Sequence, residues 1–258
     1  PSCIVGGVMN NYYTNSVLGK SDWIVVEADE SDGSFLRLNK QVAIVTNMDA
    51  EHLDYYHSVD RMNEAYLHFM NTTDFYGFCV VCADHPVVNA WAKKVKNRKI
   101  ITYGIHEDAF VRAINIKFDV GKLFFDIQKG NAIYENFVLP MFGEHNILNA
   151  LASFAVVSEL GMDVDKIRES LSHFTGTHRR FTYCGDYQGC GIYDDYAHHP
   201  EEIKATLKAA KQAVKNGKVV AIFQPHRYSR FEDLMDDFTL AFDDADMLFV
   251  MDVYAAGE

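Results

Sequence analysis

Two polar side chains able to share a metal ion follow separate apolar runs of the sequence. Glu27 comes directly after the run 23–26, which is predicted to be a buried strand, and His52 lies in the polar stretch after the run 42–45. Ligands bind where parallel strands end, and a carboxylate with an imidazole suits a divalent cation that also carries phosphate or water. The pattern predicts that Glu27 and His52 converge on one metal site. The alternative is that the acidic residues here only cap the helices that follow.

Two asparagines stand at the start of a predicted helix. Asn146 and Asn149 are three residues apart in "GEHNILNA", residues 143–150, so they share one face of that helix. An amide side chain offers both a donor and an acceptor, which suits the edge of a purine base. The alternative, that Asn146 caps the helix and Asn149 has no role in binding, stays open.

Basic and protonatable side chains recur where later predicted strands end, although the formal net charge of the chain is −12. A guanidinium can hold a phosphate through two hydrogen bonds, and surface solvation is the alternative for any one of these residues. Their recurrence at corresponding ends of predicted strands favours an anion-binding cleft. The residues are Arg179 and Arg180 in "THRRF" and His226, Arg227 and Arg230 in "FQPHRYSR". Asp195, His198 and His199 in "YDDYAHHPEE" also follow a predicted strand.

Composition narrows the class of protein. The chain has 258 residues, of which 48% are hydrophobic and 23% charged, so there is ample apolar material for a packed core. A net charge of −12 argues against wrapping nucleic acid or lying on an anionic membrane, because both need a basic surface. No apolar run approaches the roughly 18 residues of a membrane span, and no signal-peptide pattern is visible. A cytoplasmic protein without membrane insertion is expected, and oligomeric state is not predicted.

Five cysteines are scattered along the chain, an odd number that favours reduced thiols over a disulfide framework. Cys79 and Cys82 have the spacing of a zinc or redox pair, but they lie inside the apolar run 77–84 with no second pair of ligands nearby in sequence. We interpret both as buried strand residues.

Apolar runs rich in β-branched residues alternate with helical patterns, which is typical of an α/β fold with a mostly parallel sheet flanked by helices. Residues 110–139 instead alternate apolar and polar side chains, with turns at 120–121 and 129–130, which predicts a small antiparallel appendage. The predicted helices span residues 59–71, 85–96, 145–160, 164–174 and 200–215.

A domain boundary is predicted near residues 174–181, where one helix ends and a new strand pattern begins. The predicted domains are 1–178 and 179–258. The second is expected to be a partial Rossmann-like α/β domain, because roughly 80 residues are few for a doubly wound fold.

Six ordered motifs resemble those of the Mur ligase family. The resemblance covers essentially the whole chain and, through "FQPHRYSR", is strongest to the member that joins L-alanine to UDP-N-acetylmuramate in peptidoglycan synthesis. It implies ATP as co-substrate, Mg²⁺ as cofactor, an acyl phosphate intermediate, and release of ADP and phosphate. The motifs are "EADESDGSFL", "AIVTNMDAEHLD", "GEHNILNALA", "GTHRRF", "DDYAHHPEEI" and "FQPHRYSR".

The resemblance also implies metal-binding and catalytic roles. Glu27 and His52 resemble magnesium ligands, with His52 near the reacting carboxylate. Arg180 resembles an arginine that stabilises the phosphate, and His199 resembles a residue close to the reacting groups. Together these four positions form the implied catalytic centre.

Two further groups of residues are implied to bind the substrates. Asn146 and Asn149 resemble the pair that contacts adenine, Arg180 a phosphate contact, and Asp195 the residue that meets the ribose of ATP. The implied site for the carboxylate of L-alanine comprises Tyr196, His226, Arg227 and Arg230.

The sequence departs from the family pattern at both ends. The family's P-loop and UDP-binding domain are not found, since "TNSVLGKS", residues 14–21, lacks the first P-loop glycine and leads into a predicted strand. The family's carboxyl-terminal domain also continues beyond the last residues here. We therefore expect a truncated ligase that does not catalyse alone. The alternatives are another amino-acid ligase of the family, or a nucleotide- or anion-binding module without catalysis.

Overall fold

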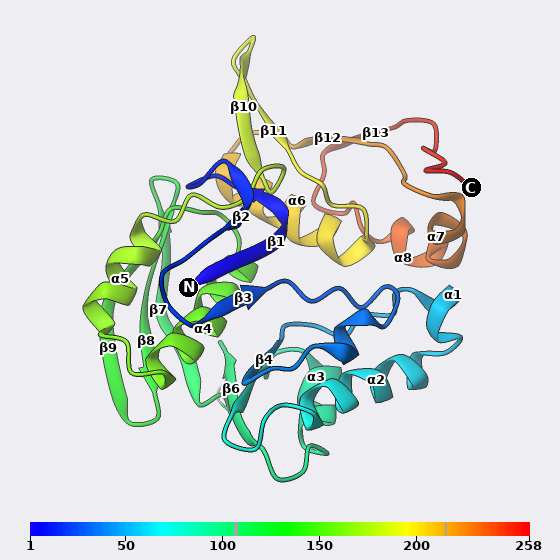
Figure 1. Ribbon diagram of the computed structural model, residues 1–258. Coiled ribbons are helices and arrows are strands. Elements are labelled where there is room, and N and C mark those ends of the chain that lie inside the picture. The colour runs from blue at the N-terminus through cyan, green and yellow to red at the C-terminus, as the bar shows by residue number, and fades with distance from the viewer. Residues whose placement is uncertain (106–107, 215) are drawn as a thin grey trace.

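The computed structural model describes residues 1–105, 108–214 and 216–258, and its centre is a six-stranded sheet (Figure 1). The strand order is β4-β5-β6-β7-β8-β9; β4 to β7 run parallel, whereas β8 and β9 pair antiparallel. The predicted antiparallel strands therefore continue the parallel sheet through the β6–β7 pair. The bounds are β4 Val42–Val45, β5 Phe78–Cys82, β6 Lys99–Gly104, β7 Val111–Asp119, β8 Lys122–Lys129 and β9 Ala132–Leu139.

Helices cover both faces of this sheet. On one face α4 (Glu144–Glu159) contacts β5, β6 and β7, and α5 (Val164–Ser172) contacts β9. On the other face α2 (Val59–Asn71) and α3 (Pro86–Ala92) share a core with β4 and β5. The predicted α/β architecture, a mostly parallel sheet flanked by helices, is confirmed.

Strand β5 is buried along its whole length, as expected for a central parallel strand. Its side chains alternate between the two cores, so Cys79 packs with α2 and α3 while Cys82 packs with α4. Both cysteines are free thiols. Their interpretation as buried strand residues is confirmed.

A separate three-stranded sheet forms at the amino terminus. It consists of β1 (Ser2–Met9), β2 (Thr14–Val17) and β3 (Ile24–Val26) in the order β2-β1-β3. The run 23–26 forms a strand as predicted, but its predicted burial is wrong, because Ile24 and Val25 are 55% and 51% exposed. Among the described residues β3 is an edge strand that pairs with β1 on one side, so its other side is not enclosed by a neighbouring strand.

The segment that leads into the carboxyl-terminal part is bound to the turn between β1 and β2. Asn10 donates from its side chain to the carbonyl oxygen of Thr175 (2.8 Å) and from its backbone to that of Gly176 (3.0 Å). The Asn11 amide oxygen accepts from the backbone N–H of Thr175 (3.1 Å). These contacts fix the start of the carboxyl-terminal part against the first sheet.

The carboxyl-terminal part begins with a projecting β-hairpin and continues as a small α/β unit, at the top of Figure 1. Its core is formed mainly by residues of α6, β12 and α8, whereas β13, which pairs in parallel with β12, is exposed. The elements are β10 Thr182–Tyr187, β11 Cys190–Asp194, α6 Pro200–Val214, β12 Val220–Phe223, α7 Tyr228–Asp233, α8 Met235–Thr239 and β13 Met247–Val250.

Helix boundaries agree with the sequence where a side chain caps the helix. α2 spans the predicted residues, with Ser58 accepting from the backbone of Arg61 at its start. α3 ends at Ala92, four residues before its predicted end, because the chain then tightens into i→i+3 hydrogen bonds at residues 91–95. α5 ends at Ser172 and α6 at Val214; the last residue predicted for α6, Lys215, lies outside the described residues.

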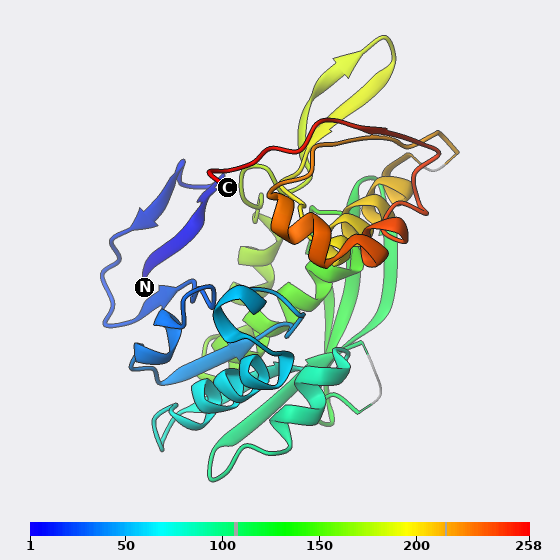
Figure 2. The same ribbon diagram turned by 90° about the vertical axis from the view of Figure 1, so that its right-hand side faces the viewer.

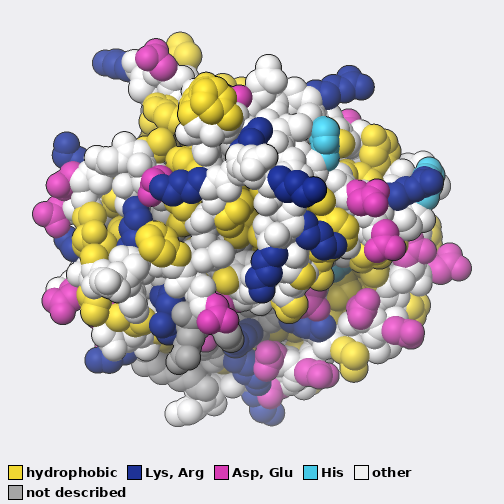
Figure 3. Space-filling view, turned by 90° about the horizontal axis from the view of Figure 1, so that it is seen from below, with side chains coloured by type: hydrophobic (Ala, Val, Ile, Leu, Met, Phe, Trp, Pro, Cys, Tyr) yellow, Lys and Arg dark blue, Asp and Glu magenta, His cyan; other side chains and the backbone are white. Residues whose placement is uncertain are grey.

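The surface carries both signs of charge. On the face shown in Figure 3, Lys and Arg side chains are interspersed with acidic and hydrophobic ones, so the net charge of −12 does not produce a uniformly acidic surface there. Within the described ranges, no helix combines the length and the apolar character needed to cross a membrane.

Candidate active site between the two parts of the chain

A polar cleft of about 370 Å³ lies between the central part and the carboxyl-terminal part. In Figure 2, α7 faces α1 (Leu53–Tyr56), and the cleft is formed by side chains next to these two helices. Five of the predicted catalytic or substrate-binding residues line it, together with three others, of which His198 is one of the side chains expected at the end of a predicted strand. The predicted ones are His52, Tyr196, His226, Arg227 and Arg230, and the others are Ser31, Asp54 and His198.

On the central side, the cleft is bounded by the loop that follows β4. His52 has a left-handed backbone (φ 55°) and begins the short helix α1. Its Nε2 lies 3.6 Å from Glu30 Oε1, and ligand atoms of Glu30, Glu51 and His52 all lie within 4.8 Å of one another. Burial raises the pKa of Glu30 above its ordinary value, and the negative charges of Asp29 and Glu51 add to this increase.

An ion pair crosses the cleft. Arg230 Nε of α7 lies 3.5 Å from Glu51 Oε1, and both side chains are less than a quarter exposed. This separation is too long for a strong hydrogen bond, which is why the same Glu51 oxygen is also a buried atom without a hydrogen-bond partner among the described residues. The two charges nevertheless hold the two parts of the chain together here.

Three buried polar atoms at this boundary have no hydrogen-bond partner within the part of the chain that the structure describes. They are Glu51 Oε1, His199 Nε2 and His226 Nδ1. An unsatisfied buried polar atom costs about 1–3 kcal/mol, and native proteins contain few of them. Their concentration beside one cleft indicates that a polar ligand or water completes the hydrogen bonding.

The histidines of the carboxyl-terminal side are close to one another. The rings of His198 and His226 are 6.2 Å apart. Burial lowers the pKa of His226, and the positive charges of Arg230, His198 and Arg227 lower it further, which favours a neutral imidazole at neutral pH. His226 can therefore accept a hydrogen bond in the cleft as well as donate one.

Asp49 also lies at the boundary between the two parts of the chain, but it is not among the residues that line the cleft. Its carboxylate lies 3.1 Å from His85 Nε2. The hydrogen bond from His85 holds the pKa of Asp49 below its ordinary value, and the charge of His199 contributes in the same direction. His199 is buried and belongs to the carboxyl-terminal part, so Asp49 lies close enough to that part for its charge to affect the carboxylate.

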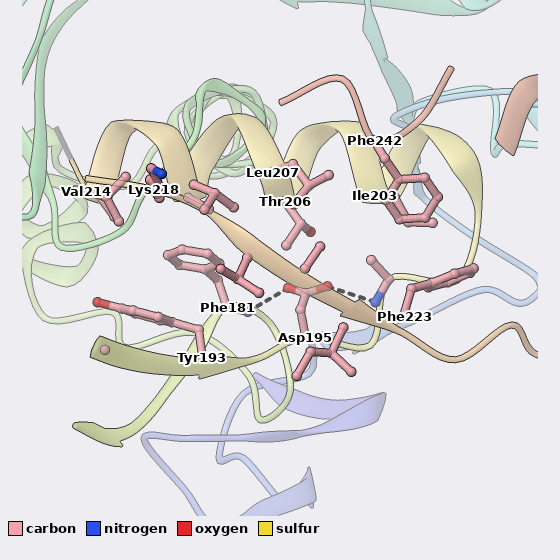
Figure 4. A pocket seen from close by; sticks show the side chains of 18 residues that line it. Phe181, Tyr193, Asp195, Ile203, Thr206, Leu207, Val214, Lys218, Phe223 and Phe242 are labelled. Atoms are coloured by element: carbon pink, nitrogen blue, oxygen red, sulfur yellow. Dashed lines mark hydrogen bonds between the residues drawn. The ribbon is translucent and has the colours of Figure 1, made fainter. Parts of the chain in front are cut away.

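Arg180 and Asp195 lie outside the polar cleft. Arg180 is half exposed and donates to Glu202 Oε1 (3.1 Å). Asp195 lines a smaller, mostly apolar groove of about 230 Å³, shown in Figure 4. Its two oxygens accept the backbone N–H groups of Phe181 (2.7 Å) and Ala197 (2.8 Å), so in this structure Asp195 organises the loops around the groove.

The two asparagines share the first turns of α4, as predicted. Asn146 donates to the carbonyl oxygen of Phe142 (2.7 Å), whereas the Asn149 side chain is exposed. The neighbouring His145 is largely buried, and this burial lowers its pKa; the charge of Asp195 opposes the change while that of Arg180 adds to it. Because the charges of Asp195 and Arg180 affect the pKa of His145, the start of α4 lies near the residues predicted to contact the ribose and the phosphates.

Glu27 is not part of the cluster around His52. Its Oε2 accepts the backbone N–H of Gly6 in β1. Convergence of Glu27 and His52 at one sheet edge requires that they follow strands of the same sheet, whereas β3 and β4 belong to different sheets. The role of Glu27 as a metal ligand stays a prediction.

Sequence reasoning did not select Glu30, Glu51 or Glu202 as site residues. Glu30 belongs to the same acidic run as Glu27, and Glu51 directly precedes His52, so proximity in sequence was an available signal for both. No such signal distinguishes Glu202 from Glu201, because only the fold brings the former to Arg180.

Comparison with known proteins identifies the family to which the chain is similar. The family model described as the Mur ligase middle domain matches residues 10–157, and the model described as the glutamate ligase domain of Mur ligases matches residues 179–257. A UDP-N-acetylmuramate–L-alanine ligase of Caulobacter vibrioides is 49% identical over 263 aligned residues. This alignment covers all of the chain but 56% of the relative, so the chain spans little more than half the length of the curated relatives it matches.

Solved structures give the same picture of the fold. The UDP-N-acetylmuramate-alanine ligase of Thermotoga maritima superposes with a TM-score of 0.81 and 30% identity, over 100% of this chain and 56% of that one. A MurF ligase from the same organism, solved in complex with ADP, has a TM-score of 0.76 at 18% identity and covers 96% of this chain and 59% of its own. The second match concerns the fold alone.

Proposed function

The chain belongs to the Mur ligase family, and we propose that it carries part of an ATP-dependent ligase that joins L-alanine to UDP-N-acetylmuramate in peptidoglycan synthesis. In this proposal residues 1–178 belong to the domain that handles ATP, and residues 179–258 to the start of the domain that binds the amino acid. The names of the relatives at about 49% identity support the choice of substrates.

One observation carries the proposal. The cleft combines His52 from one part of the chain with Tyr196, His226, Arg227 and Arg230 from the other. A ligase must hold a phosphorylated acid and an amine together, and a cleft between two parts brings two substrates into one reacting geometry. The buried atoms at its edge that have no hydrogen-bond partner among the described residues fit a polar ligand.

The proposed reaction has two steps. An oxygen of the lactyl carboxylate attacks the γ-phosphorus of ATP, forming an acyl phosphate and releasing ADP. The amino group of L-alanine then attacks the acyl carbon, and the tetrahedral intermediate collapses to the amide with loss of phosphate and a proton. Such chemistry depends on positioning and on stabilising negative charge more than on a protein nucleophile.

The ATP end of the site is proposed to lie along the start of α4. Asn146 and Asn149 would meet adenine, Asp195 the ribose, and Arg180 the phosphates. Asp195 already accepts two backbone N–H groups, but a carboxylate has about four acceptor positions, so it can also accept from a ribose hydroxyl.

A magnesium ion fits the residues beside His52. An imidazole and two carboxylates, from His52, Glu30 and Glu51, offer ligand atoms within 4.8 Å of one another. One Glu51 oxygen is buried and has no hydrogen-bond partner in the described part of the chain. Bound there, Mg²⁺ would neutralise phosphate charge. His52 and Glu27 remain the ligands proposed from the family resemblance.

The amino-acid end is proposed to lie on α7 and the loop before it. Arg230 and Arg227 would bind the carboxylate of L-alanine, with Tyr196 and His226 beside them. His199 is proposed to lie near the reacting groups, where its Nε2, buried and without a partner in the ranges that the structure describes, can hydrogen-bond to a substrate. Because Arg230 is 3.5 Å from Glu51, an incoming carboxylate would compete with Glu51 for the guanidinium.

A chimera tests the function. In the Caulobacter vibrioides relative, the span aligned with this chain is replaced by the chain itself. The relative then supplies the segments outside that span. We expect release of phosphate that requires UDP-N-acetylmuramate, ATP, Mg²⁺ and L-alanine together. Arg230→Ala should raise KM for L-alanine, whereas Lys204→Ala, which removes an exposed surface ion pair, should not.

Other outcomes of this assay would contradict the proposal. A chimera that unfolds cooperatively but releases phosphate only with a different amino acid would indicate another ligase of the family. A folded chimera that binds MgADP by calorimetry and turns over no amino acid would indicate a nucleotide-binding module, especially if Asn149→Ala abolishes that binding.

A further inference from the structure

Glu202 occupies the third position of α6, where its side chain reaches back past the start of the helix. Its Oε2 accepts the backbone N–H groups of His198 (3.0 Å) and His199 (3.3 Å). Its Oε1 accepts from Arg180 Nη1 (3.1 Å). The carboxylate thus caps the helix with one oxygen and holds a guanidinium with the other.

The two histidines that Glu202 holds face the boundary between the parts of the chain. His198 lines the polar cleft, and its Nδ1 is also 3.5 Å from Glu202 Oε2. His199 is buried, and its Nε2 has no hydrogen-bond partner among the described residues. Its charge lowers the pKa of Asp49 on the central part. A single carboxylate therefore fixes the backbone that carries both side chains.

Glu202 is ionised in this environment. Burial acts to raise its pKa, but the backbone N–H of His198, the charge of His198 and the charge of Arg180 together bring the pKa below its ordinary value. A carboxylate accepts stronger hydrogen bonds than a neutral acid does. All three backbone and side-chain contacts therefore persist at neutral pH.

We propose that Glu202 is a positioning residue. It holds the Arg180 guanidinium and the backbone of His198 and His199 in a fixed arrangement, so that the proposed phosphate contact stays in place relative to the cleft. The inference deepens the proposed function and rests on it for the roles of Arg180 and His199. Glu202 itself touches no substrate in this scheme. It acts through the groups that do.

The neighbouring residue Glu201 provides a matched control. It has the same charge in the same first turn of α6, so it interacts equally with the helix dipole. Its side chain is exposed and pairs with Lys204 on the surface (2.6 Å). Replacing either glutamate by glutamine removes one charge, but only Glu202→Gln removes it from Arg180 and the two histidines.

Nuclear magnetic resonance of the 258-residue chain tests the positioning directly. In the unmodified protein, the amide protons of His198 and His199 should shift upfield as the pH falls, with one shared midpoint below the ordinary range of glutamate. In Glu202→Gln this titration should disappear, and the side-chain Nε–H signal of Arg180 should move or broaden. In Glu201→Gln both features should remain. Amide titrations that persist in Glu202→Gln, or an unchanged Arg180 signal, would overturn the inference.

Kinetics in the chimera provide a second readout that global destabilisation would not reproduce. Glu202→Gln should lower kcat by about 10- to 100-fold with little change in KM for L-alanine, as expected for misplaced reacting groups. Full kcat in this variant would overturn the positioning role even if its amide signals change. An inactive parent chimera would reject the ligase function, whereas the resonance experiment reports on Glu202 without any turnover.

Discussion

Two cavities formed by the described residues differ in origin and in chemistry. The polar cleft of about 370 Å³ is lined by polar or ionisable side chains that come from both parts of the chain, from Ser31 to Arg230. The apolar groove of about 230 Å³ is lined entirely by residues of the carboxyl-terminal part, between Phe181 and Phe242. The groove forms within one folding unit, whereas the cleft exists only where the two parts meet.

The side chains of the groove pack against one another, whereas those of the cleft are suited to bind a ligand. In the groove, the carboxylate of Asp195 is satisfied by backbone N–H groups and the other lining side chains are mostly apolar. Beside the cleft, Glu51, His199 and His226 each have a buried atom without a partner among the described residues. Substitutions around the groove should therefore cost stability, while those around the cleft should mainly change ligand binding and the connection between the parts.

The largest effect is expected from Phe223, a buried residue whose ring packs against Phe238 and Phe242 beside the groove. Phe223→Ala should lower the free energy of unfolding by about 3–4 kcal/mol, measured by urea denaturation, because it leaves a cavity. Phe249→Ala, on the paired strand β13, 53% exposed and not among the residues that line the groove, should cost about 0.5 kcal/mol or less. Equal losses for the two variants would contradict the assignment of the groove to the core.

A smaller loss of stability is expected from Asp195. Asp195→Ala leaves the backbone N–H groups of Phe181 and Ala197 without an acceptor, which should cost about 2 kcal/mol in the same measurement. Asp194→Ala, which removes an exposed ion pair with Arg179, should cost about 0.5 kcal/mol or less. If the stability of the Asp195 variant is unchanged, the carboxylate serves binding rather than the local fold.

The ion pair across the cleft should contribute less again. A double-mutant cycle with Glu51→Gln and Arg230→Gln should give a coupling free energy of about 1 kcal/mol, since the pair is largely shielded from water. The exposed pair Glu201–Lys204 should give about 0.3 kcal/mol. No coupling at the first pair would mean that it does not hold the two parts together.

The smallest effect is a pH dependence at the boundary. The folded-state pKa of Asp49 lies below its unfolded value, so its stabilising contribution is complete above the ordinary aspartate range and is lost as pH falls through the folded-state pKa. Thermal unfolding of Asp49→Asn should therefore show a weaker loss of stability between about pH 5 and 3 than the unmodified protein. Parallel curves for the two proteins would contradict the Asp49–His85 assignment.

Local patterns determined much of the architecture. The α2 boundaries, the buried β5 strand and the antiparallel strands of residues 111–139 follow from periodicity and capping, which act over a few neighbouring residues. The six motifs were also sufficient to identify the family. The family resemblance, not the local pattern, implied one binding site for Tyr196, His226, Arg227 and Arg230, and all four line the polar cleft together with His52.

The sequence by itself thus determined which segments form strands and helices and which side chains have suitable chemistry. Only the tertiary structure decided which of these side chains meet. Glu27 and His52 follow strands of different sheets, whereas Glu51 meets Arg230, and Glu202 rather than Glu201 meets Arg180. The physical reason is that secondary structure depends on neighbours along the chain, while a cleft between two parts depends on how their separately packed cores are oriented.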